Sequence, residues 1–164
     1  MQFKSSPSIG GGSKNFLKLK DKESVVGVFR GMPHEFYVVW KDNKSHIVDE
    51  STPKASFRFR INFVLSENGV YVAKVFEQGA TVYNLLKELH EECDLEKAIV
   101  KITRSGTGTN TTYSIIPSMK QKLTKEMSAQ IDAVALQPLE HGKRDDETPE
   151  GKLNPFDSDE EIPF

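Results

Sequence analysis

The feature that most constrains the fold of this sequence is the clear alternation of apolar and polar residues within 56–65, which holds at each position from 56 to 63. Every second position is apolar (Phe57, Phe59, Ile61, Phe63), and the positions between are polar (Arg58, Arg60, Asn62). A period of two indicates a β-strand that buries one face, because successive side chains point to opposite faces. Asn68-Gly69 follows as a hairpin turn into a second strand over 70–77. The centre of the chain is therefore predicted to be an antiparallel hairpin.

The same alternation predicts which side chains of this hairpin face solvent. On the first strand, Arg58, Arg60 and Asn62 are expected to point outward. On the second strand, we expect Tyr71, Ala73 and Val75 on the inner face, with Lys74 and Phe76 outside.

The flanking segments supply further strands and two helices. Predicted strands cover 23–30, ending at Gly31, and then 98–104 and 111–116, which are joined by a Ser/Gly/Thr-rich loop. Apolar residues at helical spacing predict one helix from an N-cap at Thr81 to Cys93 and a C-terminal helix over 123–134. Three strands, a helix and two strands is the order of a five-stranded OB-fold barrel. We therefore expect a mainly β fold of this kind, although other small α+β folds share the order.

Composition divides the chain into three parts. Residues 1–15 form a basic arm with a Gly-rich stretch that is predicted to be flexible, and 16–137 form one domain. Residues 138–164 carry nine acidic and three basic residues and four prolines, which predicts a disordered acidic tail. The rest of the chain has 19 basic and 15 acidic residues. A mildly basic body joined to an acidic tail is typical of a polyanion-binding protein with an interaction tail.

Several classes of function find no support in the sequence. Cys93 is the single cysteine, which excludes an internal disulfide and a multi-cysteine zinc site. Gly106-Thr107-Gly108 lacks the ending of a phosphate-binding loop, and no nucleophile motif is present. Neither a membrane-spanning run nor a secretory signal is seen. We therefore expect a cytoplasmic protein that is not an enzyme and uses no cofactor or metal.

Basic and aromatic residues of the body match the needs of single-strand binding, in which rings stack on bases and cations follow phosphates. Trp40 is the first candidate for stacking, with Phe76 and Tyr113 as further ones. The candidate phosphate and polar contacts are Arg30, Lys54, Arg58, Arg60, Asn62, Lys74, Lys101 and Arg104. Surface arginines on a solvated sheet and an ordinary core tryptophan are the alternative interpretations.

The last eight residues combine an acidic run with an apolar tip. The candidate partner-binding residues are Asp157, Asp159, Glu160, Glu161, Ile162, Pro163 and Phe164. Ile162 and Phe164 could fill a small apolar pocket while the acids pair with a basic rim, and Pro163 limits the entropy lost on docking. A solubilising acidic end is the alternative, but it gives no reason for an Ile-Pro-Phe terminus.

This tail resembles the acidic Ile-Pro-Phe tip of bacterial single-stranded DNA-binding proteins. The body resembles the OB domain of bacteriophage single-stranded DNA-binding proteins at Phe16-Leu17-Lys18-Leu19-Lys20, Phe29-Arg30-Gly31, Phe57-Arg58-Phe59-Arg60 and Ile102-Thr103-Arg104-Ser105-Gly106. The absence of a Cys/His cluster does not fit the zinc-containing phage variety.

The resemblance implies binding of single-stranded DNA without sequence preference during replication, recombination and repair. It implies that the tail recruits a polymerase, helicase-primase or nuclease, in the cytoplasm of a bacterial host if the protein is viral. An RNA-binding OB module and a protein-interaction adaptor are the alternatives that the residues leave open. Monomer and dimer are both compatible with the sequence.

Overall fold

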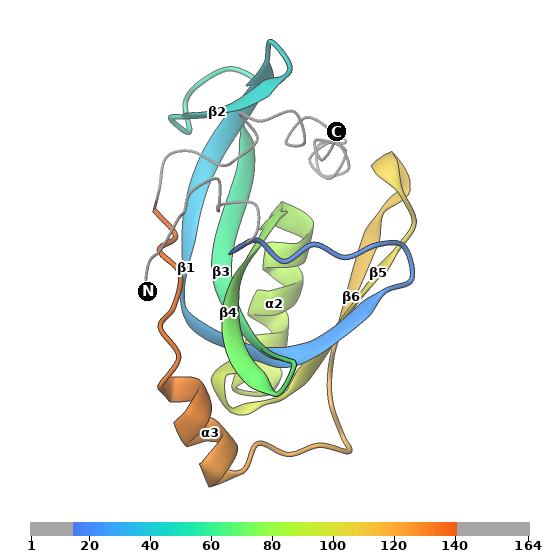
Figure 1. Ribbon diagram of the computed structural model, residues 1–164. Coiled ribbons are helices and arrows are strands. Elements are labelled where there is room, and N and C mark those ends of the chain that lie inside the picture. The colour runs from blue at the N-terminus through green and yellow to red at the C-terminus, as the bar shows by residue number, and fades with distance from the viewer. Residues whose placement is uncertain (1–14, 141–164) are drawn as a thin grey trace.

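The computed structural model describes residues 15–140 of the 164-residue chain (Figure 1). Residues 1–14 of the predicted arm and 141–164 of the predicted tail lie outside the described residues, and the division into three parts remains a prediction.

The described residues form a mainly β structure built on one open antiparallel sheet of six strands. The strands follow the order β4-β3-β1-β5-β6, and β2 pairs with β1 outside this path. Two α-helices and two short 3-10 helices complete the described part. The elements are β1 (Ser24–Lys41), β2 (Lys44–Val48), β3 (Ser56–Glu67), β4 (Val70–Gly79), α2 (Ala80–Glu92), η2 (Leu95–Lys97), β5 (Val100–Ser105), η3 (Gly108–Asn110), β6 (Thr112–Pro117) and α3 (Lys125–Asp132).

The first strand is longer than predicted because Gly31 does not end it. The pairing of β1 with β3 shifts register between Arg30 and His34, and Gly31 takes a φ of 84° at this point. A bulge bends a strand without ending it, and glycine adopts positive φ at no steric cost. β1 therefore continues beyond the bend to Lys41.

A sixth strand was missed for a similar reason. Asp42 and Asn43 have φ values of 55° and 62° and form a two-residue turn from β1 into β2. Asn and Asp tolerate this left-handed conformation, which two-residue hairpin turns require. The prediction of five strands is therefore wrong, and Trp40 lies inside β1 near this turn.

The central hairpin is confirmed, but the two predicted faces of β4 are exchanged. Lys74 lies opposite Phe63 and Ala73 lies opposite Val64, so the row of Tyr71, Ala73 and Val75 does not share the face of the phenylalanines. Residues directly opposite each other in an antiparallel pair share a face. Ile61 lies opposite Phe76, and Asn62 lies opposite Val75. Phe76 therefore points into the same core as Ile61 and is only 1 % exposed, while Val75 shares the other face with Asn62.

Both faces of the β3–β4 region are covered, which explains why eight consecutive residues of β3 are buried. The larger core lies against α2 and joins Phe29, Phe59, Phe63, Phe76, Leu86 and Ile102. A smaller core on the opposite face joins Val28, Val64, Ala73, Ile99 and Ile131, the last of these from α3. Alternation alone cannot reveal a strand that is buried on both sides, because its polar positions still alternate with apolar ones.

Both predicted helices are present with shifted ends. The N-cap of α2 is Gly79 in place of the predicted Thr81. In α3, the hydroxyl of the N-cap Thr124 accepts a hydrogen bond of 3.0 Å from the backbone N–H of Met127. Within residues 15–140, no helix is both long and apolar enough to cross a membrane.

Candidate nucleic-acid interface

The two arginines of β3 that were predicted to point outward are buried around a carboxylate. Arg60 Nε lies 2.9 Å from Glu77 Oε1, and Arg58 Nε lies 3.4 Å from Glu77 Oε2. Arg58 is 3 % exposed and Arg60 is 2 % exposed. The guanidinium carbon of Arg60 also lies 4.8 Å from the ring centroid of Phe36. The predicted outward orientation is therefore wrong, since these cations neutralise Glu77 inside the protein.

The cover over this face is the segment of residues 134–140, which we call the C-terminal strap. The Asn62 side chain donates to the carbonyl of Gln137 (3.0 Å) and accepts from its backbone N–H (2.8 Å). Arg60 Nη1 donates to the carbonyl of Leu139 over 3.3 Å. In Figure 1 the strap runs from α3 along β1. Asn62, also predicted to face outward, is consequently buried.

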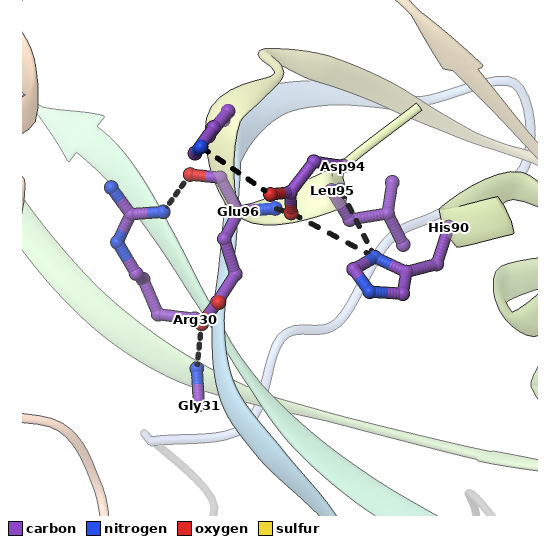
Figure 2. A network of polar contacts seen from close by, with 7 residues as sticks. Arg30, Gly31, His90, Asp94, Leu95 and Glu96 are labelled. Carbon is purple, nitrogen blue, oxygen red and sulfur yellow. Dashed lines mark hydrogen bonds and ion pairs between the residues drawn. The ribbon is translucent and has the colours of Figure 1, made fainter. Parts of the chain in front are cut away.

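Three other predicted phosphate contacts have intramolecular partners. Arg30 Nε lies 3.2 Å from Asp132 Oδ1, and Arg30 Nη1 donates to the carbonyl of Glu96 (Figure 2). Lys74 Nζ lies 3.0 Å from Glu67 Oε2.

Arg104 on β5 is the third of these residues. Its Nη1 donates to the carbonyl of Leu19 over 2.8 Å, and its Nη2 donates to the hydroxyl of Thr111 over 3.2 Å. Together with Arg30 and Lys74, this side chain connects elements of the fold.

Two of the three predicted stacking rings also belong to the core. Phe76 and Tyr113 pack against each other with ring centroids 6.0 Å apart, which brings β4 near β6. Phe76 is wholly buried and Tyr113 is half-buried. The predicted outward position of Phe76 is therefore wrong.

Trp40 is different, because it is 40 % exposed on a projecting hairpin. We call the exposed residues Trp40, Lys41, Lys44 and His46 of this hairpin, together with the exposed Lys54 of the loop between β2 and β3, the hairpin patch. Lys41 and Lys44 are paired directly across the β1–β2 hairpin, next to the pair of Trp40 and Ser45. Because successive side chains of a strand alternate, the indole and this lysine pair lie on opposite faces of the hairpin. A hairpin that exposes both an indole and ammonium groups offers what base stacking and phosphate contact require.

The base of this hairpin is held by aromatic packing. The rings of Tyr37 and Phe57 meet edge to face, with centroids 5.7 Å apart. Desolvation by burial, followed by the nearby carboxylates of Glu50 and Glu35, raises the pKa of the Tyr37 phenol. Tyr37 therefore stays neutral at physiological pH and helps to position the strand that carries Trp40.

A second basic surface comes from the segment that connects β4 with β5. Its backbone bonds to β4 through Leu17 N–H and Val75 O (2.8 Å), and to β5 through Lys22 N–H and Arg104 O (2.7 Å). We call residues 16–22 the crossing segment, which Figure 1 shows passing between these strands. Its exposed ammonium groups are Lys18, Lys20 and Lys22, and the predicted residue Lys101 is exposed on β5.

Sequence reasoning singled out Trp40, Lys54 and Lys101 but did not choose the other lysines of these two surfaces. The alternation of Leu17, Lys18, Leu19 and Lys20 was the available signal, because it already indicates lysines on one face. For Lys41 and Lys44 the signal was the Asp42-Asn43 turn between them. Within residues 15–140, no group of three or more metal-ligating side chains comes together. The predicted partner-binding residues 157–164 lie outside the described residues.

Comparison with known protein families, curated proteins and solved structures finds no match for this chain.

Proposed function

We propose that this protein binds single-stranded DNA without base-sequence preference, using the hairpin patch and the crossing segment. The observation that carries the proposal is the exposed ring of Trp40 on the β1–β2 hairpin, which also exposes Lys41 and Lys44. Stacking is sequence-tolerant, because every base has a π-face, and it contributes about 1–3 kcal/mol per base.

The topology supports an OB-type arrangement for this proposal. In the OB fold, the loop between the first two barrel strands and the loop between the last two bind oligonucleotides. Here the hairpin patch lies at the end of β1 and in the first connection, from β1 to β3, and the second connection joins β5 to β6. The strand path with α2 between β4 and β5 fits this order, with β2 as an addition. Figure 1 shows both hairpins projecting toward the same end of the molecule.

The proposed mechanism assigns stacking to Trp40 and phosphate contacts to exposed lysines. The lysines of the hairpin patch and of the crossing segment, together with Lys101, lie in solvent. Arg58, Arg60, Asn62 and Phe76 have no part as direct contacts in this scheme, because the C-terminal strap and the core bury them. With lysine contacts dominating, affinity falls steeply as salt rises.

The decisive experiment is a titration of the full chain with single-stranded DNA, duplex DNA and single-stranded RNA at two salt concentrations. Trp40 is the only tryptophan, so its fluorescence reports on this site directly. We expect quenching by single-stranded DNA at low salt, with duplex DNA binding more weakly. Equal or tighter binding of RNA would favour the RNA-binding alternative. No response to any nucleic acid at low salt would favour the alternative that this protein is a protein-interaction adaptor.

The acidic tail gives the proposal a second part, the recruitment of replication and repair proteins. Its Ile-Pro-Phe tip and acidic run suit an apolar pocket with a basic rim on a partner. Removing residues 157–164 should abolish capture of such partners and leave DNA binding unchanged or tighter. Undiminished capture would exclude the tail from the function.

A further inference from the structure

An apolar cavity of about 560 Å³ lies away from both basic surfaces, between α2, η2 and the bend of β1. Its apolar lining is contributed by Phe29, Met32, Pro33, Ile61, Leu86 and Leu95. Met32 at the bend is 82 % exposed. A cavity of this size and lining is typical of a site that receives an apolar group. Figure 2 shows a polar network that includes Gly31, His90, Leu95 and Glu96, which also line the cavity.

That polar network holds the bend of β1 against η2 and α2. The carboxylate of Glu96 accepts a 3.2 Å hydrogen bond from the backbone N–H of Gly31. His90 Nδ1 accepts a 3.2 Å hydrogen bond from the backbone N–H of Leu95. These contacts fix three sides of the cavity, so an incoming group meets a preformed site.

The rim of this cavity is acidic. Two ion pairs near the cavity, Arg30 with Asp132 and Lys97 with Asp94, contribute no net charge. Three exposed carboxylates remain against the ammonium of Lys87. They are Glu96 in the lining, Glu35, which accepts a hydrogen bond from the Tyr83 hydroxyl of the lining, and Glu91, one helical turn after Lys87. An apolar cavity with this rim suits an apolar anchor flanked by basic residues and disfavours phosphate.

We propose that residues 1–14 of the same chain dock at this cavity, with the ring of Phe3 as the anchor. This segment contains Lys4 and Lys14 and no acidic residue. The other candidate within the chain is the tail, which continues from Glu140, a residue that shares a neighbouring depression with Met32 and Pro33. Its nine acidic residues would meet an acidic rim, so charge selects the N-terminal segment.

Chain length permits this docking within one molecule. Phe16 is placed beside Val75 on β4, and the 13 residue steps back to Phe3 can span up to roughly 45 Å. A tether of this kind gives an effective concentration on the order of millimolar, far above the concentration of a second copy in dilute solution. The proposal does not depend on nucleic-acid binding, since the cavity uses neither the hairpin patch nor the crossing segment.

Disulfide trapping in the full chain tests the proposal. On a Cys93→Ser background, Gln2→Cys is combined with Glu91→Cys on the rim or with Glu92→Cys, which lies about 100° further around α2. The two helix substitutions remove the same charge, so they form a matched pair. We expect the disulfide to form about tenfold faster in the Glu91→Cys combination than in the Glu92→Cys combination, at a rate independent of protein concentration.

Adding Phe3→Ala to the Glu91→Cys combination should lower its rate of disulfide formation to that of the Glu92→Cys combination. Equal rates at the two positions would overturn the proposal, and so would an unchanged rate with Phe3→Ala. A rate that rises with protein concentration would assign the cavity to a second copy. Faster trapping by Ile162→Cys than by Gln2→Cys would assign it to the tail. DNA binding plays no part in any of these results, so they stand apart from the test of the proposed function.

Discussion

The arginines of β3 and the lysines of the β1–β2 hairpin are both cationic and both lie near aromatic residues in the sequence, yet the arginines are buried and the lysines are exposed. Arg58 and Arg60 are buried around Glu77 beneath the C-terminal strap. Lys41 and Lys44 are exposed on the hairpin that also carries the exposed Trp40. The difference teaches that a strand pattern of basic and aromatic residues identifies a binding surface only under two conditions. No buried carboxylate may neutralise the cations, and no later segment of the chain may cover them.

The largest effect should come from breaking the buried cluster. Glu77→Ala removes the carboxylate that lies against the two buried guanidinium groups, and we expect the free energy of unfolding to fall by about 3–5 kcal/mol. Urea unfolding at neutral pH measures it. The matched control is Glu67→Ala, which removes the exposed partner of Lys74 and should cost about 0–1 kcal/mol. Similar losses for the two variants would mean that the cluster is not structural.

The hairpin should show the opposite behaviour, with a large effect on binding and a small one on stability. Trp40→Ala should weaken binding of a single-stranded oligonucleotide by about 1–3 kcal/mol, because one stacking platform is lost. Anisotropy of a labelled oligonucleotide measures this. Ile116→Ala, another exposed apolar residue, is the control and should leave affinity unchanged. An unaltered affinity for Trp40→Ala would move the interface to another surface.

The salt dependence of binding sharpens the same comparison. Lys41→Ala and Lys44→Ala should each reduce the slope of log affinity against log salt by roughly 0.7, the value for one phosphate contact on a single strand. Lys97→Ala, on η2 beside the acidic rim, should leave the slope unchanged. A slope that responds equally to all three substitutions would indicate that only net charge matters.

The smallest expected effect concerns Tyr83, which links α2 to β1. Its hydrogen bond to Glu35, followed by burial and the charge of that carboxylate, raises the pKa of the phenol. The folded state therefore holds this proton more tightly than the unfolded state does. The resulting stabilisation is complete below the ordinary phenol value of about 10 and is lost as pH rises through the higher folded-state value.

Substitution of Tyr83 makes this measurable. Tyr83→Phe should destabilise the protein by about 1 kcal/mol near pH 8, and this difference should shrink as pH rises above 10. Urea unfolding at several alkaline pH values follows the change, with Tyr71→Phe on β4 as the control. A difference that stays constant with pH would show that the Glu35 contact does not stabilise the protonated phenol.

Local patterns predicted much of the architecture. The alternation over 56–65 and the Asn68-Gly69 turn predicted the β3–β4 hairpin, and helical spacing predicted α2 and α3. The prediction failed at Gly31 and at Asp42-Asn43, where residues that permit positive φ continue or turn a strand. Such positions can end, bend or reverse a strand, and the choice depends on how the partner strand pairs.

The candidate site was less predictable from the same patterns. Trp40, Lys54 and Lys101 were chosen from composition and are exposed, whereas Arg58, Arg60, Asn62 and Phe76 were chosen from alternation and are buried. Alternation separates two faces of a strand but does not say which face meets solvent. The roles of Trp40, Lys54 and Lys101 in DNA binding stay predictions.

By itself, the sequence determined the mainly β character, the central hairpin and the placement of two helices, because these depend on contacts between near neighbours. Only the tertiary structure decided that the polar face of β3 is covered. The covering contact joins Asn62 to Gln137, 75 positions later in the chain. No periodicity within a strand carries information about a segment so distant, since burial of that face depends on where the whole chain folds back.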